Sequence, residues 1–162
     1  MKALVVYGSK RAGTEGLADM LGEALADHGL AVTVRAAAVA SPDLESYDVI
    51  LVGGALYAGR WHKDARRFLR RNVQVLRTKP VWLFSSGPLG DTASSAGELE
   101  PVRQVAGLME YVGARGHVTF GGRLAPDAKG FPASAMAKTQ AGDWRDPDQV
   151  RQWAKQIAVS LG

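Results

Sequence analysis

Five short apolar runs, each followed by a stretch with helical periodicity, are the feature that most restricts the possible folds of this chain. The runs are Ala3–Tyr7, Ala31–Val34, Asp48–Gly53, Pro80–Phe84 and Gly116–Phe120. The third contains Val49–Val52, which is apolar at every position, as expected of a strand covered on both faces. Strands that alternate with helices in this way predict a parallel α/β sheet.

Apolar residues between these runs repeat at helical spacing and predict four helices. The apolar positions that define them are Leu17, Ala18, Leu21, Ala24 and Leu25; Trp61, Ala65, Phe68, Leu69 and Leu76; Val102, Val105, Ala106 and Met109; and Val150, Trp153, Ala154 and Ile157. Gly29 is a natural stop for the first helix, and Asp146 with Pro147 is typical of the start of the last.

These elements predict one domain over residues 1–162, with an irregular insertion at about 121–146. Right-handed crossovers leave few possible arrangements of the sheet. We expect an α/β/α sandwich of three layers with a five-stranded parallel sheet of order 2-1-3-4-5. In such sheets ligands bind beyond the carboxyl ends of the strands, which directs attention to the loops after Tyr7, Gly53 and Phe84.

Composition excludes several classes of chemistry. The chain has no cysteine, so disulfides, iron–sulfur ligation and thiol nucleophiles are ruled out. Three scattered histidines cannot form a zinc cage, and we expect no metal site. The Gly-x-Ser-x-Gly pattern of a serine hydrolase is missing around Ser85 and Ser86, and His117 is expected at the wrong end of the sheet for catalysis. No apolar run approaches the length of a membrane span, and we expect a cytoplasmic protein, with peripheral membrane association left open.

The first loop has the chemistry of a phosphate cradle. It consists of Ser9, Lys10, Arg11, Ala12, Gly13 and Thr14, and it leads from a buried strand directly into a helix. The start of such a helix offers unpaired amides, two hydroxyls lie beside them, and small residues permit close approach. A Walker A loop is excluded because Thr14-Glu15 follows Gly13 where Lys-Ser/Thr is needed, and G-x-G-x-x-G is also missing. The loop therefore suits a single phosphate.

The segment from Val5 to Leu21 resembles the flavodoxin signature. The defining positions that agree are Tyr7, Ser9, Ala12, Thr14, Ala18 and Leu21. The resemblance extends over nearly the whole chain and is nearest to the branch that contains menaquinone-dependent protoporphyrinogen oxidase. Gly53–His62 is similar to that branch's second flavin loop, and the tail Gly142–Asp146 also resembles it. The resemblance implies that Ser9–Thr14 holds the phosphate of FMN.

The resemblance also implies the residues of the second and third flavin loops. The second consists of Ala55, Leu56, Tyr57, Ala58 and Gly59, and the third of Ser85, Ser86, Gly87, Pro88 and Leu89. We expect Tyr57 to stack on the flavin ring, whereas Trp61 leads an apolar helix face and fits the core better. His62 is expected to be structural, and no catalytic residue can be named.

A run of basic residues follows the second loop. Over residues 60–71 the chain carries Arg60, Lys63, Arg66, Arg67, Arg70 and Arg71, with Asp64 the only acid. This run can be a solvated face, a docking surface for an acidic redox partner, or a contact with an anionic membrane surface. The net charge is +4, but no nucleic-acid-binding signature accompanies it.

The leading hypothesis is an FMN-binding redox protein. It would be an electron carrier or a small oxidoreductase that uses a quinone or a porphyrinogen, and its partner would be a redox protein or a quinone-like molecule. One alternative keeps the fold and binds the deazaflavin F420. Another is a non-enzymatic interaction module that uses the basic helix 60–71.

Overall fold

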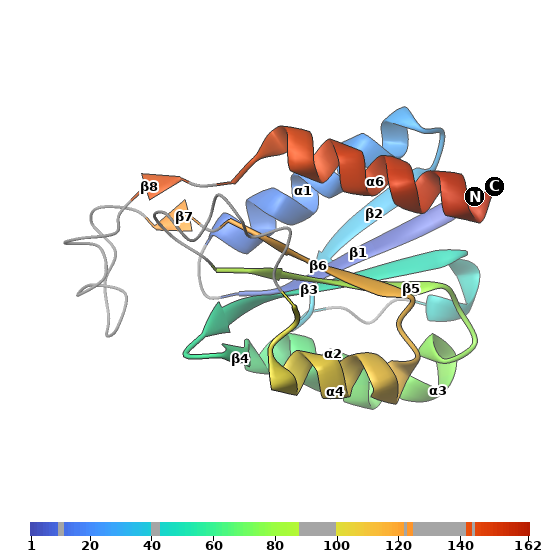
Figure 1. Cartoon of the computed structure of the whole chain (residues 1–162). Coiled ribbons are helices and arrows are strands. Elements are labelled where there is room, and N and C mark those ends of the chain that lie inside the picture. The colour runs from blue at the N-terminus through green and yellow to red at the C-terminus, as the bar shows by residue number, and fades with distance from the viewer. Residues whose placement is uncertain (10–11, 40–42, 88–99, 122, 125–141, 144) are drawn as a thin grey trace.

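The computed structural model describes residues 1–9, 12–39, 43–87, 100–121, 123–124, 142–143 and 145–162. Its centre is a parallel sheet in the order β2-β1-β3-β5-β6 (Figure 1). The strands are β1 (Lys2–Gly8), β2 (Ala31–Ala36), β3 (Val49–Tyr57), β5 (Val81–Ser86) and β6 (Gly116–Phe120). Each overlaps a predicted run. The predicted order 2-1-3-4-5 is confirmed, because β4 is a short extra strand that pairs only with β3.

Helices cover both faces of the sheet, as Figure 1 shows. Helices α1 (Ala12–Asp27) and α6 (Pro147–Leu161) lie on one face. Helices α2 (Lys63–Arg71), α3 (Val73–Leu76) and α4 (Arg103–Val112) lie on the other. A short 3-10 helix, η1 (Leu44–Ser46), precedes β3. The Asp146 carboxylate accepts a hydrogen bond from the backbone N–H of Asp148 and so caps α6, as predicted.

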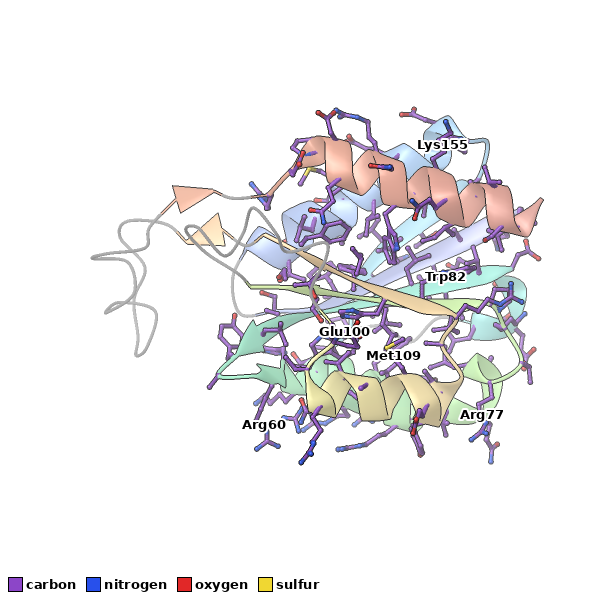
Figure 2. The ribbon with its side chains drawn as sticks, in the orientation of Figure 1. Arg60, Arg77, Trp82, Glu100, Met109 and Lys155 are labelled. Atoms are coloured by element: carbon purple, nitrogen blue, oxygen red, sulfur yellow. The ribbon has the colours of Figure 1, made fainter. Side chains whose placement is uncertain are left out.

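Two apolar cores lie on the two faces of the sheet. In β1, Ala3 and Val5 face α1 and α6, whereas Leu4 and Val6 face α2 and α4. All four are fully buried, as expected of a strand that is covered by helices on both faces. Charged side chains such as Arg60, Arg77 and Lys155 project away from these layers (Figure 2).

The structure corrects the bounds of the second predicted helix. One helix was expected from Trp61 to Leu76, but Trp61 belongs to strand β4 (Arg60–Trp61) and the helix is interrupted at Asn72. The side chain of Asn72 donates a hydrogen bond to the backbone oxygen of Phe68 at 2.9 Å. The same oxygen also accepts from the backbone N–H of Asn72, so backbone and side chain of Asn72 both bond to the last turn of α2, and α3 begins at the next residue.

The structure describes the segment 121–146 only near its two ends. Strands β7 (Arg123–Leu124) and β8 (Gly142–Asp143) pair as an antiparallel ladder beyond the main sheet. Most of this segment, including 125–141, lies outside the described residues, so the irregular insertion stays a prediction. Within the described ranges, no helix is long and apolar enough to cross a membrane.

Candidate functional site

The strand register brings the three predicted loops to one edge of the sheet. Gly8 at the end of β1 pairs with Gly54 of β3, and Gly54 pairs with Ser85 of β5. The segments that follow these positions therefore emerge side by side at the carboxyl edge. In a parallel α/β sheet this is the edge where ligands bind.

Helix α1 begins inside the first loop, at Ala12. Its first backbone amides have no partner within the helix and carry the positive end of the helix dipole. Gly13 and Thr14 are buried in the first turn, while Lys10 and Arg11 lie outside the described residues. The start of α1 thus brings its first amides and the Thr14 hydroxyl into one turn, while the phosphate cradle itself stays a prediction.

Thr14 also connects the first loop to the end of β5. Its Oγ1 lies 2.6 Å from Oγ of Ser86, and one hydroxyl donates to the other. Both residues are buried, with 2% and 4% of their surface exposed. This hydrogen bond holds the start of α1 against the strand that leads into the third loop.

Arg145 adds a cation that the sequence analysis did not single out. Its guanidinium packs against α1 at Gly16, where any side chain would overlap it. Gly16 is three and four residues beyond Gly13 and Ala12, so all three lie on the same face of α1. The sequence offered two signals, the tail Gly142–Asp146 and a glycine inside a helix, and neither identifies this contact. Burial and the nearby carboxylate of Glu15 raise the pKa of Tyr7 on the strand before this loop.

The structure corrects the prediction for the second loop, because Ala55–Tyr57 belong to a strand. Gly53 and Gly54 were expected to end β3, but β3 continues to Tyr57 and turns back into β4. The two glycines are needed inside the strand because the rings of Phe84 and Trp61 occupy the space of their side chains. Tyr57 pairs with Arg60, which leaves a turn of two residues, Ala58 and Gly59.

The turn at Ala58 and Gly59 has the tight hairpin geometry in which both central residues have positive φ. The φ angles are 51° for Ala58 and 75° for Gly59. Gly59 adopts this conformation without strain, whereas Ala58 adopts one that side chains rarely occupy. The backbone of this turn is thus set in a defined orientation at the rim of the site.

The aromatic residues of this segment have separate roles. Trp61 is 1% exposed and belongs to the core, as expected, so its ring is not available for a ligand. Tyr57 is partly exposed near the turn, with its ring 6.4 Å from that of His62. His62 is buried and caps α2 by accepting a hydrogen bond from the backbone N–H of Asp64, which is the structural role predicted for it.

A buried polar network lies under the second and third loops. Trp61 Nε1 donates to Ser85 Oγ at 2.9 Å, and Ser85 Oγ lies 2.8 Å from His117 Nε2. Burial lowers the pKa of His117 to about 4, so the imidazole is neutral at neutral pH. Although His117 is near the start of β6, its side chain reaches the ligand-side half of β5. Ser85 is 1% exposed and no described carboxylate bonds to His117 Nδ1, so the pair lacks the arrangement of a hydrolase.

The third loop is described only at its start. Ser85 and Ser86, predicted in the loop, are the last two residues of β5, because they continue its pairing with β6. The backbone N–H of Gly87 donates to the oxygen of Phe120 at 3.3 Å. Pro88 and Leu89 lie outside the described residues. In the part of the chain that the structure describes, no three His, Asp or Glu residues come together as a metal site.

Comparison with known proteins identifies the family. Residues 4–129 match the sequence model of the flavodoxin domain. The chain belongs to the flavodoxin domain family. Protoporphyrinogen IX dehydrogenase [quinone] of Escherichia coli K12 is 22% identical over 175 aligned positions, which cover 98% of this chain and 95% of that protein.

Solved flavodoxins share the fold. A flavodoxin from the domain Archaea has a TM-score of 0.65 at 18% identity, and the match covers 99% of both chains. A flavodoxin of Streptococcus pneumonia TIGR4 has a TM-score of 0.63 at 19% identity, again over 99% of both chains. At these identities the structural similarity shows that the chain has the flavodoxin fold, and it does not identify a substrate.

Proposed function

We propose that this member of the flavodoxin domain family binds FMN at the carboxyl edge of its sheet and passes electrons to a quinone-like acceptor. The observation that carries the proposal is the meeting of three loops with the start of α1 at one edge. FMN offers a phosphate monoester at one end and a flat ring at the other. A cradle of amides and hydroxyls beside an aromatic hairpin fits both ends of such a molecule.

The phosphate end is the better supported half of the proposal. The amides of Ala12, Gly13 and Thr14 and the hydroxyls of Ser9 and Thr14 supply neutral donors. The guanidinium of Arg145 supplies a positive charge at Gly16, on the same face of α1. This donor set matches a phosphate dianion, because charge-assisted hydrogen bonds to phosphate oxygens are the strong ones.

The ring end relies on the hairpin. Tyr57 offers an aromatic face, and the turn at Ala58 and Gly59 offers backbone groups with a fixed orientation. The buried hydrogen bonds that join Trp61, Ser85 and His117 hold the base of this hairpin in place. The flavin, when bound, supplies the reversible acceptance and donation of electrons, and these residues orient its ring and limit access of water.

The quinone as acceptor is supported by the name of the Escherichia coli relative, which matches this chain over nearly its full length. The FMN-loaded protein is first reduced in the absence of oxygen. We expect the soluble quinone menadione to reoxidise it at a rate that saturates as the menadione concentration increases. Stopped-flow recovery of the flavin absorbance measures this rate, and free reduced FMN is the control. A rate that rises linearly and equals that of free FMN contradicts a quinone site on the protein.

A further inference from the structure

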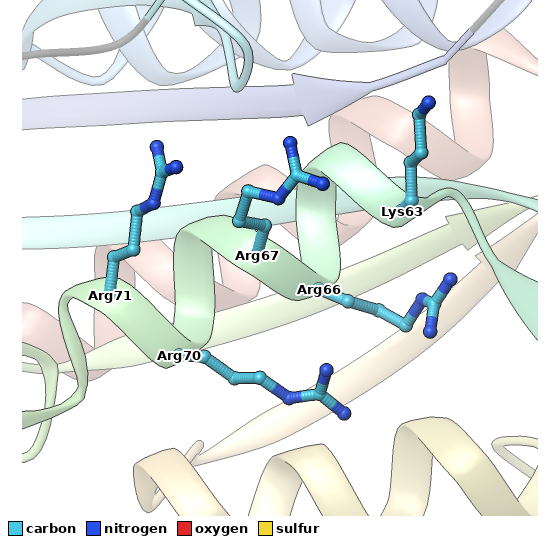
Figure 3. A pocket seen from close by; sticks show the side chains of 5 residues that line it. All are labelled: Lys63, Arg66, Arg67, Arg70 and Arg71. Atoms are coloured by element: carbon cyan, nitrogen blue, oxygen red, sulfur yellow. The ribbon is translucent and has the colours of Figure 1, made fainter.

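Helix α2 carries five basic side chains, which we call the basic stripe: Lys63, Arg66, Arg67, Arg70 and Arg71. They line a shallow groove of about 320 Å³ (Figure 3). Their spacing of three and four residues puts them along one side of α2. Ala65, Phe68 and Leu69, on the other side, are buried against the sheet. The packing of α2 therefore explains its apolar residues but not its cations.

No acid within the described residues neutralises the basic stripe. The nearest carboxylate in sequence, Asp64, lies 3.6 Å from His62 Nδ1 rather than on an arginine. Arg66 Nε donates to the backbone oxygen of Trp61, and this bond leaves its charge unpaired by any described acid. The other four side chains form no ion pair with a described residue, and all of them are exposed. A cluster of like charges is destabilising on its own, so a bound anion would relieve it.

The basic stripe begins beside the candidate site. Lys63 is the first residue of α2 and follows β4, the second strand of the Tyr57 hairpin, after one residue. Arg60, on the same strand, is exposed and extends the positive charge to the hairpin itself. A macromolecule that covers the basic stripe therefore reaches the rim where the ring of a flavin is proposed to lie.

The chemistry of this surface favours acidic protein over lipid. Four of the five cations are arginines, whose forked guanidinium groups pair well with carboxylates. Binding to a bilayer by an amphipathic helix needs exposed apolar side chains, and those of α2 are buried. Among the described residues, the large exposed apolar side chains are Met1, Val39, Tyr111 and Val159, none of them on α2.

A second copy of the chain is a weaker candidate for the same surface. Its acidic side chains Glu15, Asp19, Glu23 and Asp27 are exposed at four-residue spacing on α1, which covers the opposite face of the sheet. A contact between α1 of one copy and α2 of the next joins two different faces. Such a contact leaves one free face at each end and tends to give open chains rather than a closed oligomer.

We propose that the basic stripe docks the acidic surface of a redox partner protein beside the Tyr57 hairpin. That this partner exchanges electrons rests on the proposed function, whereas docking through charge does not. Electrostatic complementarity of this kind steers the encounter and weakens with salt.

The test compares two variants that change the net charge by the same amount. The first reverses the stripe with Arg67→Glu, Arg70→Glu and Arg71→Glu. The second reverses exposed cations elsewhere, on β2 and α6, with Arg35→Glu, Arg151→Glu and Lys155→Glu. Circular dichroism confirms folding of each. Binding to poly-L-glutamate is measured by calorimetry at low ionic strength, in parallel with vesicles of phosphatidylcholine and phosphatidylglycerol at matched anionic charge.

We expect the natural chain to bind polyglutamate more tightly than the vesicles, and the stripe variant to lose affinity for polyglutamate about tenfold or more. The control variant should stay within about twofold of the natural chain. Equal losses in both variants, tighter binding to vesicles, absence of polyglutamate binding, or self-association that the stripe variant abolishes would each overturn the proposal. FMN binding is titrated in the same samples, so loss of docking and failure to bind flavin are recorded separately.

Discussion

Replacing Thr14 by valine is expected to weaken FMN binding about 10- to 100-fold, the range for loss of a hydrogen bond to a charged group. Valine keeps the shape of threonine but removes the hydroxyl that lies in the first turn of α1. The dissociation constant is measured by quenching of flavin fluorescence on titration with the protein. Riboflavin, which has no phosphate, should bind the variant and the natural chain with nearly equal affinity.

Two comparisons make this result specific for the phosphate. Thr33→Val, on β2 and outside the site, makes the same chemical change and should leave FMN binding unaltered. The Thr14 variant also leaves the buried Ser86 hydroxyl without its partner, so its stability is measured by urea unfolding. Affinity for FMN and riboflavin that falls by the same factor in Thr14→Val would contradict a phosphate contact and indicate a disturbed fold.

Replacing Gly53 by alanine is expected to destabilise the fold by about 2–3 kcal/mol, through overpacking. A methyl group at this position overlaps the ring of Phe84. That ring cannot easily retreat, because the rings of Phe120 and Trp153 lie behind it with centroids 6.2 Å away. Urea unfolding followed by tryptophan fluorescence measures the free energy.

The double variant and a second glycine sharpen this prediction. In the double variant Gly53→Ala with Phe84→Leu, the loss of unfolding free energy should be smaller than the sum of the losses in the two single variants. The smaller leucine side chain leaves room for the methyl group. Gly107→Ala, in α4 with open space around it, should instead stabilise the protein by about 0.5–1 kcal/mol. Strict additivity of the first pair, or equal destabilisation by both alanines, would contradict the close packing of Gly53 on Phe84.

The fold was accessible from the sequence because its signals are local. Val49–Val52 predicted a strand buried on both faces, and Asp146 with Pro147 predicted the start of α6; the structure confirms both. The order of the sheet followed from the handedness of crossovers rather than from any residue. The carboxyl edge, and thus the place of the candidate site, followed from that order.

What the sequence did not predict depends on contacts between distant residues. Gly53 and Gly54 were interpreted as the end of a strand, because the aromatic rings that require them, from Phe84 and Trp61, belong to other elements. The extension of β3 and its turn into β4 were therefore not predicted. The contact of Arg145 with Gly16 joins residues at opposite ends of the chain, and no periodicity reports such a pair.

The identity of the ligand carried by the purified protein tests the central proposal most directly. The protein is purified without added cofactor, and its absorption spectrum is recorded. Any ligand is then released with acid and identified from its mass by mass spectrometry. A protein emptied during purification is titrated with FMN and with F420. Our account predicts a yellow protein that releases FMN, or an emptied one that takes up FMN and regains the flavin bands. Release of F420, or a protein that refuses FMN, would contradict it.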